Sequence, residues 1–63
     1  METLKPYKFR IFLKNGEYYT YPYDDYNWHI LSDQQLVVVT DSNDVKWLVL
    51  DLNDFSRVEV IAE

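Results

Sequence analysis

The chain has 63 residues, no cysteine and a formal net charge of −5. A chain of this length forms one domain at most, near the lower limit at which a hydrophobic core folds unaided. Without cysteine, neither a disulfide framework nor a thiolate metal site can supplement that core. Because 48% of the residues are hydrophobic and 17% are aromatic, we expect residues 1–63 to fold as one domain. Either an unusually aromatic core or self-association then buries the surplus aromatic surface.

Nothing in the sequence resembles a secretory signal or a membrane span. The first six residues lack an apolar core, and the longest apolar run, Leu36–Val39, has only the length of a strand. We therefore expect a soluble, cytoplasmic protein that makes no membrane contact.

The clearest local signal is Asn15-Gly16, which separates the aromatic-rich runs Tyr7–Lys14 and Glu17–Tyr23. Asn-Gly favours a hairpin with a two-residue type I′ turn, because both central residues of that turn need a positive φ. The resulting register predicts a core face with Tyr7, Phe9, Ile11, Leu13, Tyr18, Thr20 and Pro22, and an outward face with Lys8, Arg10, Phe12, Lys14, Glu17, Tyr19, Tyr21 and Tyr23.

Pro22 limits the second strand of this hairpin. In the predicted register it lies opposite Phe9, and it has no peptide N–H to donate to a further neighbour. We expect the second strand to be an edge strand or to bend out of the sheet at this point.

The rest of the chain alternates strands and turns. Residues 24–33 show neither a helical nor a strand period, and we expect a loop with one short turn. The alternative is a single helical turn capped by Asp24 or Asp25. The β-branched run Gln35–Thr40 predicts a strand buried on both faces. Polar turns at 41–44 and 52–55 then separate strands at Val45–Asp51 and Arg57–Ala62.

Five short strands with regular turn signals predict an all-β fold. We expect a small five-stranded antiparallel barrel or a strongly bent sheet, with the longer loop after the second strand, because closure removes edges that a small sheet cannot otherwise protect. No internal repeat, low-complexity tract or linker is visible.

Charge is unevenly distributed along the chain. Residues 1–16 carry a balance of +3 and residues 17–63 a balance of −8. An acidic chain is repelled by the phosphates of nucleic acid, so direct nucleic-acid binding is disfavoured. The carboxylates serve either solubility or contact with a partner. The predicted acidic surface contains Asp24, Asp25, Asp41 and Asp44, together with Asp33, Asp51 and Asp54.

Nothing in the sequence indicates an active site. His29 is the single histidine and has no cysteine or acid at ligand spacing, so we expect a loop histidine bonded to a backbone group rather than a metal ligand. The pair Asp24-Asp25 suits a turn or cap better than acid–base catalysis. Residues 41–44 resemble the start of a calcium loop but lack its glycine and final glutamate. We expect no enzyme activity, no cofactor and no metal.

The outward face of the hairpin has three interpretations that stay open. Its aromatic side chains can stabilise one another across strands, stack on nucleic-acid bases, or form a protein interface. We expect the third for part of the face, since Tyr and Arg often anchor interfaces. The predicted interface residues are Arg10, Phe12, Tyr19, Tyr21 and Tyr23.

The strand order, together with Lys14-Asn-Gly-Glu17, Lys46-Trp47 and Leu52–Glu59, resembles the Sm-like small five-stranded barrels. It also resembles the short acidic β proteins of phages and prophages of low-GC Gram-positive bacteria. The Sm-like RNA-binding loops are not recognisable, so RNA binding is not implied. The phage-type resemblance implies a stoichiometric inhibitor of a host immunity or nucleic-acid-processing protein, whose basic groove would meet the acidic surface.

Two other functions remain open at this point. One is a small barrel that binds single-stranded nucleic acid through Arg10, Phe12, Tyr19 and Tyr21. The other is a structural subunit of a larger assembly. For the favoured function we expect a homodimer or higher oligomer whose partner is a host protein.

Overall fold

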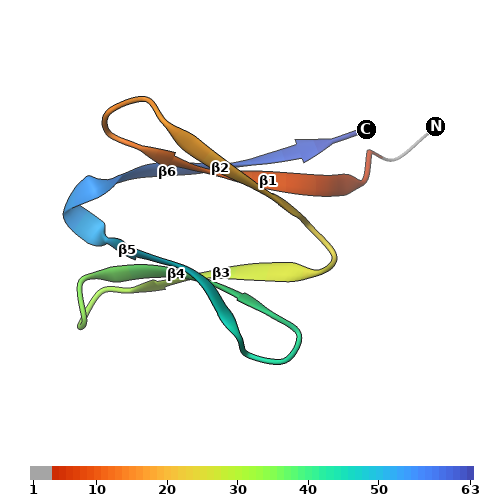
Figure 1. Cartoon of the computed structure of the whole chain (residues 1–63). Coiled ribbons are helices and arrows are strands. Elements are labelled where there is room, and N and C mark those ends of the chain that lie inside the picture. Colours follow the sequence, from red (N-terminus) through yellow and green to blue (C-terminus); the bar gives the residue numbers. More distant parts are fainter. Residues whose placement is uncertain (1–3) are drawn as a thin grey trace.

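The computed structural model describes residues 4–63 and shows an all-β fold (Figure 1). The described part contains six strands and one short 3-10 helix, and no helix in it is long or apolar enough to cross a membrane. In chain order these elements are β1 (Pro6–Leu13), β2 (Tyr18–Pro22), β3 (Tyr26–Leu31), β4 (Leu36–Asp41), β5 (Lys46–Asp51), η1 (Leu52–Asp54) and β6 (Phe55–Ala62).

The strands form two separate antiparallel sheets that pack face to face. Sheet A has the order β2-β1-β6, and sheet B has the order β3-β4-β5. Figure 1 shows sheet A above and sheet B below, joined by the β2–β3 connection on one side and by η1 on the other. The all-β prediction is confirmed, but the five-stranded closed barrel is wrong, because the sheets do not pair with each other and a sixth strand is present.

The additional strand is β3, in the segment expected to be a loop. Tyr26, Trp28 and Ile30 alternate with Asn27 and His29, which is the two-residue period of a strand packed on one face. The whole strand pairs with β4 without interruption. Only a three-residue turn, and no helical turn, separates β2 from β3.

The β1–β2 hairpin is present, but its register differs from the prediction by one residue. The loop has three residues: the Leu13 N–H donates to the Glu17 carbonyl at 2.8 Å, and the Gly16 N–H donates to the Leu13 carbonyl at 3.0 Å. Gly16, at φ 93°, supplies the left-handed residue that follows a type I turn in such loops. The expected two-residue type I′ turn is therefore wrong.

This one-residue difference turns β2 over relative to β1. Phe9 lies opposite Tyr21 and Ile11 opposite Tyr19, so these tyrosines share the core face. Pro22 lies opposite Lys8 rather than Phe9. The prediction of an edge strand is confirmed, since β2 has β1 as its single neighbour in sheet A.

The β4–β5 hairpin closes in the same way as β1–β2. The Asp41 N–H donates to the Val45 carbonyl and the Asp44 N–H donates to the Asp41 carbonyl, both at 3.1 Å. Asp44 has a φ of 62° and takes the place of Gly16. The position is left-handed in both turns, although only one of them carries glycine.

The equivalence extends over all six strands of the described structure and reveals an internal structural repeat. The unit β1–β2–β3 corresponds to β4–β5–β6, and each unit gives its third strand to the sheet of the other, so β3 pairs with β4 and β6 with β1. After the second strand of each unit, an N–H returns to the residue at or just before the first strand: Tyr23 to the Tyr7 carbonyl at 3.0 Å and Leu52 to the Gln35 carbonyl at 2.9 Å. An approximate two-fold axis therefore relates the two halves seen in Figure 1.

The core consists of matching positions from the two central strands. Phe9 and Ile11 of β1 and Val37 and Val39 of β4 are fully buried. Phe9, Ile11 and Val39 form one core cluster between the sheets. Val38, on the outer face of β4, is also buried. The prediction that this run is buried on both faces is confirmed.

Candidate functional site

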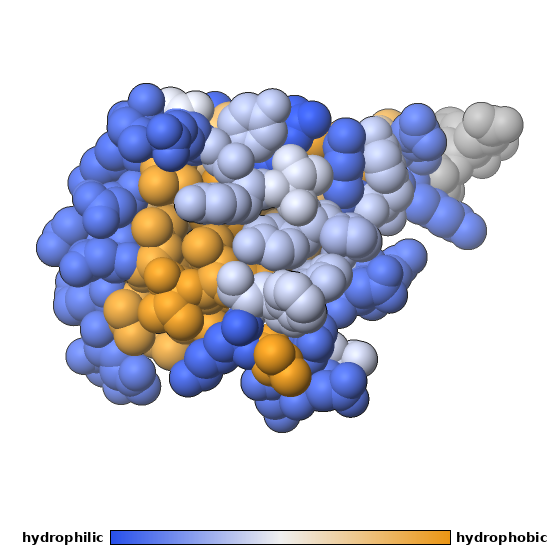
Figure 2. All heavy atoms as spheres, in the orientation of Figure 1, coloured by the Kyte–Doolittle hydropathy of each residue, from blue (hydrophilic) through white to orange (hydrophobic). Residues whose placement is uncertain are grey.

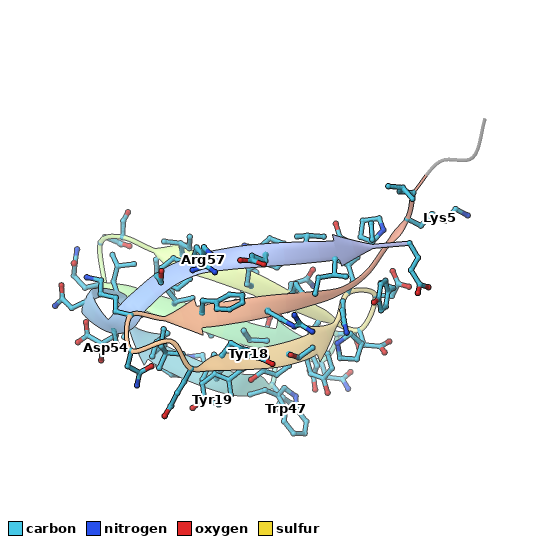
Figure 3. All side chains as sticks on the ribbon, turned by 90° about the horizontal axis from the view of Figure 1, so that it is seen from above. Lys5, Tyr18, Tyr19, Trp47, Asp54 and Arg57 are labelled. Atoms are coloured by element: carbon cyan, nitrogen blue, oxygen red, sulfur yellow. The ribbon has the colours of Figure 1, made fainter. Side chains whose placement is uncertain are left out.

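The predicted interface residues do not share one face. Arg10 and Phe12 lie on the outer face of sheet A, whereas Tyr19 and Tyr21 lie on the opposite face with Phe9. Figure 3, which looks onto the outer face of sheet A, shows Tyr18 close to β1 and Tyr19 at the edge. Tyr18, which the sequence placed in the core, is therefore the tyrosine that accompanies Arg10 and Phe12.

The inner tyrosines belong to a continuous series of aromatic contacts between the sheets. Successive ring centres are 4.8 to 6.4 Å apart, within the range of favourable aromatic pairs. The order of the rings is Trp47, Tyr26, Tyr21, Phe9, Trp28 and Tyr23. Burial raises the pKa of the Tyr21 hydroxyl above its usual value. For Tyr21 the structure therefore supports the first of the three interpretations, in which the aromatic side chains stabilise one another within the chain.

The first candidate surface is the outer face of sheet A, here called the basic face, with Lys8, Arg10, Phe12, Tyr18 and Arg57. The Arg10 guanidinium carbon lies 5.1 Å from the Tyr18 ring centre, and that of Arg57 lies 4.1 Å from the Phe12 ring centre. The two rings are 5.2 Å apart. The face therefore presents two arginines stacked on a pair of aromatic rings.

One carboxylate lies on this face. The Glu59 side chain accepts a hydrogen bond from Arg57 Nε at 2.7 Å, and both side chains are about half exposed. Arg10 Nε is buried and has no hydrogen-bond partner. Three cations against one carboxylate make this face positive in a chain whose net charge is −5.

The second candidate surface is an acidic end of the molecule, formed by Asp24 and Asp25 of the β2–β3 turn and by Asp41 and Asp44 of the β4–β5 turn. Both turns lie on the right in Figure 1. They are tied together by Tyr26, which pairs with Asp41 and packs against Trp47. Asp24, Asp25, Asp41 and Asp44 therefore gather at one end. The other aspartates of the predicted acidic surface do not join them: Asp33 lies in the β3–β4 turn, Asp51 ends β5 and Asp54 lies in η1.

Within this acidic end, Asp41 organises its own turn. Its carboxylate accepts hydrogen bonds from the N–H groups of Asn43 at 2.8 Å and Val45 at 3.0 Å, and from Trp47 Nε1 at 2.9 Å. The bond from the Trp47 indole, followed by the backbone bonds, holds the pKa of Asp41 below its usual value. Its main role is structural.

A shallow hollow opens beside the acidic end and is lined by Tyr23, Tyr26, Asn27 and Trp28; we call it the corner hollow. Tyr23 and Trp28 meet edge to face across it at 6.4 Å. The sequence placed Tyr23 on the outward face of the hairpin, whereas the structure places it in the lining of the corner hollow. The alternation of Tyr26 and Trp28 with polar residues would have located this site.

His29 lies on strand β3 rather than in a loop, and its Nε2 is 3.1 Å from Thr40 Oγ1. Its partner is thus a side chain and not the expected backbone group. Among residues 4–63, no group of three or more His, Cys, Asp or Glu side chains is placed to hold a metal ion.

Figure 2 shows the molecule from the side on which the two sheets are seen edge-on, and side chains fill the space between them. A hydrophobic patch (orange) lies on the left, paler side chains of intermediate hydropathy cover the centre, and hydrophilic residues surround both. Comparison of the chain with protein-family models, with curated proteins and with solved structures found no match.

Proposed function

We propose that the chain is a non-enzymatic binding module that acts by stoichiometric contact with a basic surface of a protein partner. The observation that supports this function is the acidic end, where Asp24 and Asp25 adjoin the corner hollow. Carboxylates accelerate the encounter with a basic partner and orient it, while Tyr and Trp side chains supply anchoring contacts.

The resemblance to phage-type proteins suggests the kind of partner. A host immunity or nucleic-acid-processing protein has a basic groove for nucleic acid, and an acidic module that occupies the groove blocks it by stoichiometric binding. The predicted cytoplasmic location agrees with this function. Self-association remains a prediction, which light scattering of the purified chain tests.

The repeat provides a matched control for the electrostatic test. Asp25, in the β2–β3 turn, corresponds to Asp54 in η1 at the other side of the molecule, since Tyr26 and Phe55 begin equivalent strands. Asp25→Asn and Asp54→Asn remove the same charge from the two ends. Both side chains are exposed, so neither change disturbs the core.

The experiment captures a partner from a lysate of the presumed host and then measures its affinity for each purified variant at two salt concentrations. We expect Asp25→Asn to weaken binding several-fold more than Asp54→Asn, and added salt to weaken binding to the wild type. Equal affinities for the two variants, together with no dependence on salt, would contradict the proposal.

The basic face supports a second candidate function, binding of single-stranded nucleic acid. Bases stack on aromatic side chains while nearby cations contact phosphates, and here Phe12 and Tyr18 lie beside Arg10 and Arg57. A fluorescence titration with labelled oligonucleotides at low salt separates the candidates. Binding that is lost in Arg10→Gln and Tyr18→Ala favours this second function, and the absence of binding removes it.

A further inference from the structure

The two open sheets have four edge strands, and three of them carry features that discourage pairing with another strand. Strand β2 contains Pro22, and β5 has a register shift near Trp47. Strand β6 also has an irregular register and carries the ion pair Arg57–Glu59. Strand β3 differs: Tyr26–Leu31 contains no proline and no Asp, Glu, Lys or Arg, and its register with β4 is unbroken.

The backbone of β3 presents unused hydrogen-bonding groups to this edge. On β4, the Asp41 N–H and the Gln35 carbonyl just before the strand both bond toward the β5 side. Because alternate residues of a strand direct their polar groups to opposite neighbours, the groups of Leu36, Val38 and Thr40 face β3.

These β4 residues lie opposite every second residue of β3, namely Asn27, His29 and Leu31. The N–H and C=O groups of those three residues form hydrogen bonds within sheet B. The N–H and C=O groups of Tyr26, Trp28 and Ile30 consequently point away from β4. Sheet B has no strand on that side in the described structure.

Two further features mark this edge as a place for a strand. The corner hollow lies along it, lined by three successive residues of β3. Ile30, farther along, is 52% exposed. A hollow beside an open edge is what side-chain recognition needs when a peptide adds to a sheet.

Charge indicates the nature of the added strand. The neutral edge is bracketed by Asp24 and Asp25 before β3 and by Asp33 after it. A second copy paired antiparallel would bring these like charges toward one another, whereas a segment with Lys or Arg at both ends would meet them favourably.

We infer that the free edge of β3 binds an extended segment of a protein partner by strand addition, with basic residues flanking an uncharged stretch. The inference rests on the proposed function, since it specifies how a basic partner is held. The three outward peptide groups of β3 supply the main-chain hydrogen bonds, the corner hollow takes one side chain, and the flanking carboxylates contact the basic residues.

The test uses the peptide Lys-Lys-Val-Thr-Val-Thr-Val-Lys-Lys as a probe, with amide hydrogen exchange of the full chain read by NMR. We expect the amides of Tyr26, Trp28 and Ile30 to become protected by about tenfold or more when the peptide binds. A peptide with glutamate in place of lysine gives no protection.

The repeat again supplies a matched pair of variants. Ile30 on β3 and Val60 on β6 are equivalent edge residues, 52% and 45% exposed, and the N–H of each points away from its sheet. Ile30→Pro removes one outward donor and should weaken peptide binding roughly tenfold. Val60→Pro leaves binding unchanged, and Ile30→Ala, which keeps the N–H, weakens it less than Ile30→Pro.

Other results overturn the inference. Peptide binding that is sensitive to Asp25→Asn but leaves the Tyr26, Trp28 and Ile30 amides exchanging would retain the acidic-end function and reject strand addition. A dimer in light scattering that Ile30→Pro dissociates would show that a second copy occupies the edge. Equal loss of binding in the Ile30→Pro and Val60→Pro variants would assign the effect to general damage of the fold.

Discussion

Sheet A and sheet B share one three-strand plan, yet they present different surfaces. Sheet A has the basic face and two protected edges, with Pro22 on β2 and Arg57 on β6. Sheet B has an uncharged edge at β3, bordered by carboxylates in the adjoining turns. The comparison shows that the repeated backbone determines where the edges and turns lie, and that the side chains determine which of them is available to a partner.

Substitutions at the equivalent core positions Phe9 and Val37 are expected to change stability the most. Phe9→Ala should lower the free energy of unfolding by about 3–5 kcal/mol, because its ring contacts both Tyr21 and Trp28. Val37→Ala should cost about 2 kcal/mol, since less volume is removed. Urea unfolding followed by tryptophan fluorescence measures both.

A domain of this size has a total stability of roughly 3–9 kcal/mol, so Phe9→Ala is expected to leave the chain partly unfolded. If Val37→Ala proved the more damaging of the two, the aromatic series would not be the centre of the core.

Substitutions at the equivalent turn positions Gly16 and Asp44 are expected to have the next largest effect on stability. Gly16→Asp should destabilise the chain by about 1–2 kcal/mol, because a side chain is strained at a φ of 93°. Asp44→Gly, at a φ of 62°, should stabilise it by up to about 1 kcal/mol. Thermal unfolding by circular dichroism measures both, and shifts of the same sign would show that the two turns are not equivalent.

The two turns also differ in their response to acid. The pKa of Asp41 is lower in the folded chain than in the unfolded chain, so its contribution to stability is present above about pH 4. That contribution is lost as the pH falls through the folded pKa. Asp41→Asn should remove this part of the acid dependence, measured by tryptophan fluorescence, whereas Asn15→Ala in the other turn should leave it unchanged. An unaltered acid transition in Asp41→Asn would contradict the assignment.

The smallest effect belongs to the basic face. Glu59→Gln removes an exposed ion pair with Arg57 and should change stability by about 0.2–1 kcal/mol or less, since water and salt screen it. Arg57→Met, which also removes the contact with Phe12, should cost slightly more at low salt. Chemical unfolding at two salt concentrations checks both, and a larger loss would assign the face a structural role.

The sequence predicted the all-β class, the burial of β4 and the edge position of β2, but it missed the sixth strand, β3. It missed the register of the first hairpin, because Asn15-Gly16 also suits a three-residue loop in which only Gly16 is left-handed. That one residue exchanged the places of Tyr18 and Tyr19. The physical reason is the two-residue period of a strand: a register error of one residue moves every side chain to the opposite face of the sheet.

The repeat and the edge of β3 could not be read from the sequence for a different reason. The two units share few identical residues, such as Asn15 and Asn43, and the irregularity near Trp47 shifts their alignment. The alternation of Tyr26, Trp28 and Ile30 covers only six residues between two turns, so residues 24–33 taken together show no clean strand period. The gathering of Asp24 and Asp41 at one end depends on tertiary contacts alone.

The most direct test of this account is amide hydrogen exchange along β3 in the chain without any added peptide. Two open sheets with an unpaired β3 edge predict alternation: the Asn27, His29 and Leu31 amides are protected, and those of Tyr26, Trp28 and Ile30 exchange rapidly. Uniform protection of all six amides would contradict the account, because it would require a strand already paired with β3.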